Sequence, residues 1–213
     1  MTKRSDKKVR LREGIIDAAQ TVFFEKGYQG STMDDVCRCA NISKRTLYVY
    51  FASKEQLTMA VLNRGFDVLV MRFQTIEEND VIERLNWIIR TFVRFSIEHP
   101  DYFLLIAQFE NQSEDFISPQ DDAVMEVYRK ANHMFNILHK CLKEGMETNV
   151  LADHVDPMNA AIILWSSLFG ICTTMIKKRH YMKYELNRSA EEIAEDTLAL
   201  LRYALLKKSG ENL

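Results

Sequence analysis

Apolar residues recur every three or four positions along most of the 213-residue chain. This spacing is typical of amphipathic helices, whereas the alternation expected of strands is hard to find. Glycine occurs 7 times and proline 3 times, which is few for this length. We therefore predict an all-α protein. Its expected helices span residues 9–26, 32–39, 43–51, 54–74, 81–98, 101–111, 121–148, 157–178 and 189–208.

Side-chain caps mark the starts of two short helices near the N-terminus. Thr32, followed three residues later by Asp35, has the pattern of a capping box. Ser43 is placed to cap the next helix. Asn41 occupies the turn between them, where a residue that tolerates positive φ is needed. Two helices joined by a tight turn, the second exposed and basic, are typical of a helix-turn-helix unit.

The expected helix at 43–51 is unusually rich in cations and aromatic rings. Leu47 and Phe51 lie four residues apart and so share the face that we expect to be buried. Val49 is expected to help anchor the helix. The side chains expected to project toward solvent or a partner are Lys44, Arg45 and Tyr48.

The expected helix at 54–74 is long enough to join two separate parts of the chain. At about 1.5 Å per residue it would span roughly 30 Å. We therefore divide the chain into an N-terminal three-helix head, residues 1–54, and a helical body, residues 55–213. In the body, the helix at 157–178 is apolar nearly all round but contains Ser and Thr, so we interpret it as a core helix and not a membrane span.

Charge separates the two parts. Residues 1–54 hold 11 Lys and Arg against 6 Asp and Glu, whereas the remainder holds 17 against 24. A basic end favours a polyanionic partner for the head. The polar, basic segment 1–8 is expected to be a mobile arm, and without a visible signal peptide we expect a cytoplasmic protein. The four cysteines are expected to be buried, unpaired thiols.

Residues 10–57 resemble the DNA-binding head of the TetR family of transcriptional regulators. The resemblance runs without a gap through IIDAAQTVFFEKGYQGSTMDDVCRCANISKRTLYVYFASKEQL. Asn41 stands where the family usually has glycine, and Arg45 where a small residue is common. The resemblance implies contact with double-stranded DNA. The positions that it implies are Thr32, Ser43, Lys44, Arg45, Thr46, Tyr48, Tyr50 and Lys54.

The chemistry of these side chains agrees with that implication. Lys44 and Arg45 can reach O6 and N7 of guanine in the major groove, and Tyr48 can contact a phosphate or a thymine methyl. Thr32, at a helix start, can present hydroxyl and backbone N–H groups to a phosphate. Lys54 is expected to clamp a phosphate.

For the body, the resemblance implies a homodimer formed by the last two long helices and a cavity for a small apolar or amphipathic effector. No cofactor is implied, and the spacing of the histidines predicts no metal site. The candidate dimer residues are Leu164, Leu168, Ile171 and Leu201. The candidate pocket residues are Trp87, Phe92, Phe95, Phe103, Phe109, Met134, Phe135, Trp165 and Phe169.

These observations favour a repressor that an effector releases from a palindromic operator. An activator, or a DNA-binding architectural protein without an effector, remains an alternative that the sequence does not separate. An enzyme is disfavoured, because no nucleophile–base set, phosphate-binding glycine loop or carboxylate pair is found.

We predict that Tyr48→Ala weakens binding to operator DNA roughly tenfold to a hundredfold, the loss typical of one specific contact in the groove. The fold should stay intact, because the ring is expected to project from the head. A gel-shift titration beside a thermal melt measures both quantities. Unchanged affinity would remove Tyr48 from the interface.

Overall fold

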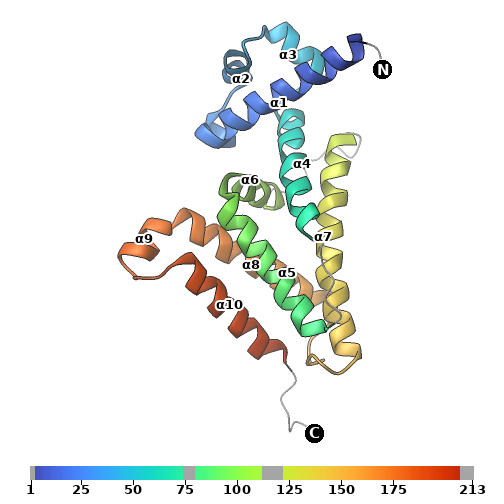
Figure 1. Ribbon diagram of the computed structural model, residues 1–213, viewed down its shortest axis with the longest axis vertical. Coiled ribbons are helices and arrows are strands. Elements are labelled where there is room, and N and C mark those ends of the chain that lie inside the picture. The colour runs from blue at the N-terminus through green and yellow to red at the C-terminus, as the bar shows by residue number, and fades with distance from the viewer. Residues whose placement is uncertain (1–2, 74–79, 112–121, 207–213) are drawn as a thin grey trace. The chain divides into compact units, whose positions relative to one another are not determined.

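The computed structural model describes residues 3–73, 80–111 and 122–206, except for the side chains at 3, 4, 190, 191, 198, 201 and 202 (Figure 1). Within these ranges the regular elements are helices, besides one isolated antiparallel bridge between Leu151 and Leu206. The prediction of an all-α fold is therefore confirmed. The helices are α1 (Lys3–Gly30), α2 (Met33–Ala40), α3 (Lys44–Tyr50), α4 (Lys54–Phe73), α5 (Val81–Glu98), α6 (Pro100–Glu110), α7 (Asp122–Glu147), α8 (Pro157–Lys177), α9 (Arg179–Tyr184) and α10 (Ala190–Leu205).

The described residues form two compact units. The head unit comprises 3–67 with 108–111 and 122–129, and the body unit comprises 68–73, 80–107 and 130–206. The helices α4, α6 and α7 each contribute to both. The expected boundary after residue 54 lies inside the head unit, because α4 continues there as a buried helix. Leu57, Val61 and Leu62 of α4 are each at most 1% exposed.

Helix α1 begins earlier than the sequence predicts, and its regular part ends near Gly27, as predicted. Helical structure starts at Lys3, so the expectation of a mobile arm through residue 8 is wrong. At the other end, Gly27 has φ 70° and interrupts the regular helix. Glycine tolerates this conformation because it has no Cβ. The buried face of α1 includes Ile15, Ala19 and Phe23, which packs it against α2.

The caps predicted around the helix-turn-helix are confirmed. The Asp35 N–H donates to Thr32 Oγ1 at 3.1 Å, and the Thr32 N–H donates to the Asp35 carboxylate at 2.9 Å. Asn41 adopts the left-handed conformation, with φ 52° and ψ 48°. Ser43 Oγ then accepts the Thr46 N–H at 3.1 Å and starts α3. These local bonds fix the angle at which α3 leaves α2.

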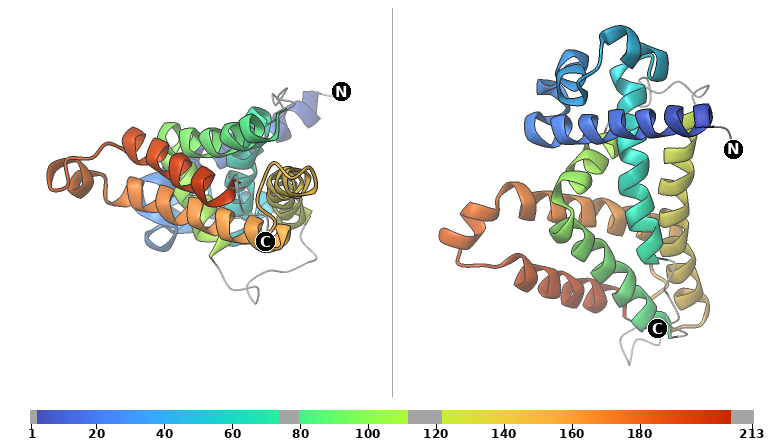
Figure 2. Two further views of the ribbon diagram at one scale, coloured as in Figure 1. Left: turned by 90° about the horizontal axis from the view of Figure 1, so that it is seen from below. Right: turned by 45° about the horizontal axis from the view of Figure 1, so that its top comes forward.

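In the body unit, α5 packs against both α8 and α10 (Figure 2). Helix α8 is long and apolar enough to cross a bilayer by length and composition, but one side of it is packed within the unit. The short helix α9 falls in the polar stretch 177–188, where the sequence predicted no helix. None of its residues is buried, so no apolar periodicity could reveal it.

Candidate DNA interface

Helix α3 has one buried side chain and a wide exposed face. Leu47 is fully buried and Phe51, which follows the helix, is 2% exposed. Tyr48 is 52% exposed and Val49 is 76% exposed, so the expectation that Val49 anchors the helix is wrong. The exposed face of α3, here called the reading face, consists of Lys44, Arg45, Tyr48 and Val49.

The reading face combines three kinds of contact group. Lys44 and Arg45 supply cationic donors, Tyr48 supplies a ring with a hydroxyl, and Val49 supplies a small apolar surface. Such a surface suits the methyl group of thymine. Sequence reasoning missed Val49 because its apolar character was taken as a sign of burial. The i, i+1, i+4, i+5 spacing of the four residues was the signal that could have found it.

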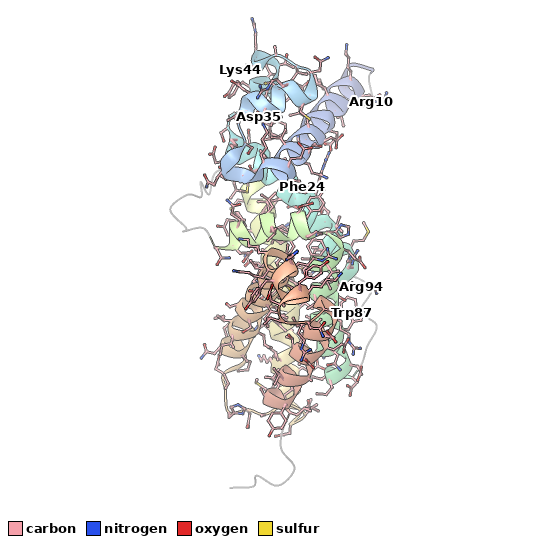
Figure 3. All side chains as sticks on the ribbon, turned by 90° about the vertical axis from the view of Figure 1, so that its left-hand side faces the viewer. Arg10, Phe24, Asp35, Lys44, Trp87 and Arg94 are labelled. Carbon is pink, nitrogen blue, oxygen red and sulfur yellow. The ribbon has the colours of Figure 1, made fainter. Side chains whose placement is uncertain are left out.

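Asp35 ties together the backbone that supports α3. Its carboxylate accepts Lys26 Nζ at 2.6 Å and also bonds the guanidinium of Arg38. Thr32 Oγ1 donates to the same carboxylate at 2.7 Å. The bonds from Lys26 and then Thr32 hold the pKa of Asp35 well below its usual value. Asp35 is 8% exposed. Because Lys26 belongs to α1 and Asp35 to α2, this cluster links the end of α1 to the start of α2. Figure 3 labels Asp35 on α2 and Lys44 on α3.

Lys44 already has a partner within the head unit. Its ammonium lies 2.7 Å from the Asp34 carboxylate, and this pairing raises the pKa of Lys44. Both side chains are more than half exposed, so the pair is weak and can exchange for a phosphate or a base. Arg45 is exposed, and no hydrogen bond or ion pair is recorded for it in the described part of the chain.

The serine and threonine hydroxyl groups among the predicted DNA contacts take part in hydrogen bonds at the helix starts. Thr32 is exposed, but its hydroxyl bonds Asp35. Ser43 is exposed, and its Oγ lies 2.9 Å from Thr46 Oγ1. Thr46 and Tyr50 are partly exposed. Contact of these four residues with DNA stays a prediction.

Lys54 has a role that the sequence did not reveal. Its ammonium donates to the Tyr28 carbonyl and, at 2.7 Å, to the Ser31 carbonyl. It also lies 4.1 Å from the centre of the Tyr28 ring. Burial lowers the pKa of Lys54 and, with a hydrogen bond to Glu55, raises that of Tyr28 to about 12. Lys54 thus holds the end of α1 and the residue that follows it, and its expected phosphate contact competes with these bonds.

The residues predicted to line a pocket mostly pack against one another. The rings of Phe92, Phe103 and Phe169 lie 5.1 to 5.5 Å apart, centre to centre. Trp165 lies 5.3 Å from Phe169 and 6.0 Å from Phe135. Phe95 and Met134 are also fully buried, and Trp87 packs on Phe73 at 5.4 Å. Phe109 belongs to the head unit, where it contacts Tyr128 at 5.3 Å. Pocket lining by this set stays a prediction.

The structure places two of the four candidate dimer residues in the interior of their own unit. Leu164 is 3% and Leu168 1% exposed, since they face the core of the body unit. Ile171 is partly exposed. Leu201 lies in α10, but its side chain is outside the described residues. The exposed large apolar side chains of α8 are Met158, Ile162 and Ile163, at 40%, 49% and 57%. A dimer interface through the four candidate residues stays a prediction.

Two family models match this chain. The one described as "Bacterial regulatory proteins, tetR family" covers residues 15–61, which include α2, α3 and the turn between them. The one described as "Tetracyclin repressor-like, C-terminal domain" covers residues 85–200, more than half of the chain. The chain belongs to the TetR family. The reading face lies within the segment that the first of these models matches.

Relatives of known function include regulators of biofilm genes. This TetR-family chain is 34% identical over 108 residues to the biofilm operon icaADBC HTH-type negative transcriptional regulator IcaR of Staphylococcus aureus. That match covers 50% of this chain and 57% of the S. aureus protein. With IcaR of Staphylococcus epidermidis the identity is 26% over 155 residues, covering 72% and 79%.

Solved structures share the fold over nearly the whole chain. FadR from Bacillus subtilis in complex with stearoyl-CoA superposes with a TM-score of 0.70 at 19% identity, over 90% of this chain and 98% of that one. AibR in complex with isovaleryl coenzyme A and operator DNA gives 0.67 at 19%, over 89% and 97%. A TetR/AcrR regulator from Thermobifida fusca gives 0.62 at 27%, over 89% and 95%.

We predict that Lys54→Ala lowers the stability of the head by about 1–2 kcal/mol, because it removes the charged donor from two backbone carbonyls. Urea unfolding measures the change, with Lys44→Ala as the control for loss of an exposed cation. A Lys54→Ala protein of unchanged stability, whose DNA affinity loses about one unit of salt slope, would favour the phosphate role instead.

Proposed function

We propose that this chain is a homodimeric repressor that binds a palindromic operator through its reading faces and leaves it when a small molecule binds the body unit. The observation that carries the proposal is the reading face itself. Lys44, Arg45, Tyr48 and Val49 share the exposed side of a helix that a cap and a buried leucine hold in place. The proposal places the protein in the cytoplasm, acting by binding alone and without catalysis.

One head reads too few base pairs to single out a genomic site, so two heads are needed. Exposed apolar side chains on the two long helices that flank α5 support a dimer. On α8 they include Met158 and Ile162, four residues apart, and on α10 they include Leu200 and Tyr203, at 71% and 72% exposed. Such surfaces are costly to leave in water, and a two-fold axis lets each meet its counterpart.

Helix α4 supports the proposed link between ligand and DNA. In the head unit, Arg64 of α4 binds Glu13 and Asp17 of α1, both at 2.7 Å. In the body unit, Arg72 of α4 bonds Glu98, at the end of α5, and its Nη2 lies 3.2 Å from His99 Nε2. A ligand that favours another position of the α5 end would therefore move α4, and the head would move with it.

The proposal that the protein represses transcription, and does not activate it, rests on the relatives. IcaR is a negative regulator by its name, and this chain matches only part of its length. FadR and AibR were solved with acyl-coenzyme A ligands, which supports an effector of small-molecule size for this fold. An activator using the same reading face is the alternative, and operator position relative to the promoter decides between them.

If the dimer forms through α8 and α10, the double variant Ile162→Glu/Leu200→Glu should be unable to dimerise. The wild-type chain should have twice its monomer mass of 24.9 kDa in solution, and the double variant should have the monomer mass. Operator affinity should fall with it, because one head alone binds weakly. Light scattering after gel filtration measures the mass, with exposed Met71→Glu on α4 as control. A dimeric double variant would place the interface elsewhere.

Effector action predicts reciprocal affinities. A small molecule that weakens operator binding by some factor must bind the operator complex more weakly by the same factor. Calorimetry with and without operator DNA measures the two ligand affinities. In the control variant Arg45→Ala/Tyr48→Ala, which should bind the operator poorly, added DNA should leave the ligand affinity unchanged. Equal ligand affinity for free and operator-bound wild type would contradict the proposal.

A further inference from the structure

The body unit contains a pocket whose lining includes none of the aromatic residues that the sequence singled out. Its volume is about 650 Å³, which is within the usual range for small-molecule sites. It is bordered by the end of α5, the start of α6, the end of α8, α9 and the segment leading into α10. All of these residues belong to the body unit.

One part of the pocket wall is apolar. Met175 and Ile176 come from the end of α8, Met182 from α9, and Ile97 and Pro100 from the α5–α6 corner. Met175 is 3% exposed, whereas Ile97 is 39% exposed. Thioether and aliphatic side chains of this kind adapt to a flexible hydrocarbon chain.

The other part of the wall is cationic. Arg179, Lys183 and Arg188 line the pocket, and all three are exposed. They belong to segment 177–188, in which five of twelve residues are Lys or Arg and one is Glu. This concentration of positive charge stands out in a body whose net charge is negative.

Two carboxylates in the wall limit the positive charge. Glu192 accepts the Ser189 N–H at 2.7 Å, and this bond lowers the pKa of Glu192 and engages its carboxylate at the start of α10. Arg188 lies near enough to Glu192 to contribute to the same shift. Asp101 is exposed in the first turn of α6. Among the described residues, no ion pair is recorded for Arg179 or Lys183, and the Lys183 ammonium lies 5.4 Å from the centre of the Tyr184 ring. Neither cation is paired with a carboxylate there, so both can take an anionic ligand.

We propose that this pocket binds an amphipathic anion, with a hydrocarbon part against the methionine and isoleucine side chains and an anionic group at Arg179 and Lys183. Placing an anion beside two cations that lack carboxylate partners satisfies both without breaking an existing pair. Burying the hydrocarbon part removes it and the apolar wall from water.

The position of the pocket gives its ligand a route to the DNA. Ser96, Ile97, Pro100 and Asp101 line it, and Glu98 and His99, between them, contact Arg72 of α4. A ligand that shifts this corner changes the hold of the body unit on α4. That the anion acts as the effector rests on the proposed function, whereas its binding to the pocket does not.

Calorimetry on the full-length protein without DNA tests the binding. The probe is decyl phosphate below its micelle concentration, and it is compared with inorganic phosphate, 1-decanol and decyltrimethylammonium. Decyl phosphate should bind at least about tenfold more tightly than any of the three, because only it offers both an anion and a chain. Equal binding of the cationic amphiphile, or of phosphate alone, would overturn the proposal.

Two double variants locate the site. Arg179→Ala/Lys183→Ala should weaken decyl phosphate binding by about tenfold or more, since each charged hydrogen bond is lost. Lys177→Ala/Lys178→Ala removes the same charge from exposed neighbours outside the pocket wall and should change it by no more than about twofold. Equal effects of the two variants, with thermal melts unchanged, would overturn the assignment.

A vesicle assay distinguishes the pocket from a membrane-binding surface. An operator titration distinguishes ligand binding from regulation. If the protein cosediments with phosphatidylglycerol vesicles and both double variants reduce this equally, the segment is a membrane-binding surface and the pocket proposal fails. If decyl phosphate binds as expected but leaves operator affinity unchanged, the pocket assignment stands and the proposed effector role of its ligand fails.

Discussion

The reading face depends on the burial of Leu47. A helix of seven residues is too short to persist in water by itself, so α3 exists because the rest of the head holds it. Leu47 and Phe51 supply the buried side, and Ser43 satisfies a backbone donor at the start. The head thereby fixes the arrangement of the reading face, with its two cations, one aromatic ring and one valine side chain. Without the head, these groups would have no defined arrangement.

A second set of contacts holds the head backbone from outside α3. Asp35 gathers Lys26, Thr32 and Arg38, while Lys54 bonds one carbonyl in the last turn of α1 and one just after it. Both groups are charged and partly shielded, so each is worth more than a surface pair. We therefore expect the two residues to influence DNA binding by positioning the helix-turn-helix, so that substitutions at either change stability and affinity together.

Much of the head was predictable because its signals are local. A cap at Thr32, a left-handed Asn41 and a cap at Ser43 depend on a few neighbouring residues, and each is found in the structure. Long helices such as α5 and α8 were predictable from periodicity. Burial of individual side chains was less so: Val49 is exposed and Leu164 is internal, because the side that a helix buries depends on partners distant in sequence. The pocket was missed for the same reason. Its wall comes from five separate segments, and helix α9 carries no apolar stripe.

The central claim is that two copies of the reading face bind successive major grooves. Selecting bound duplexes from a random-sequence pool with the wild-type protein tests it most directly. The account predicts enrichment of an inverted repeat whose half-sites are centred about 34–36 Å apart along the duplex, or a multiple of that distance. Enrichment of no sequence, or of a single half-site without two-fold symmetry, would contradict it.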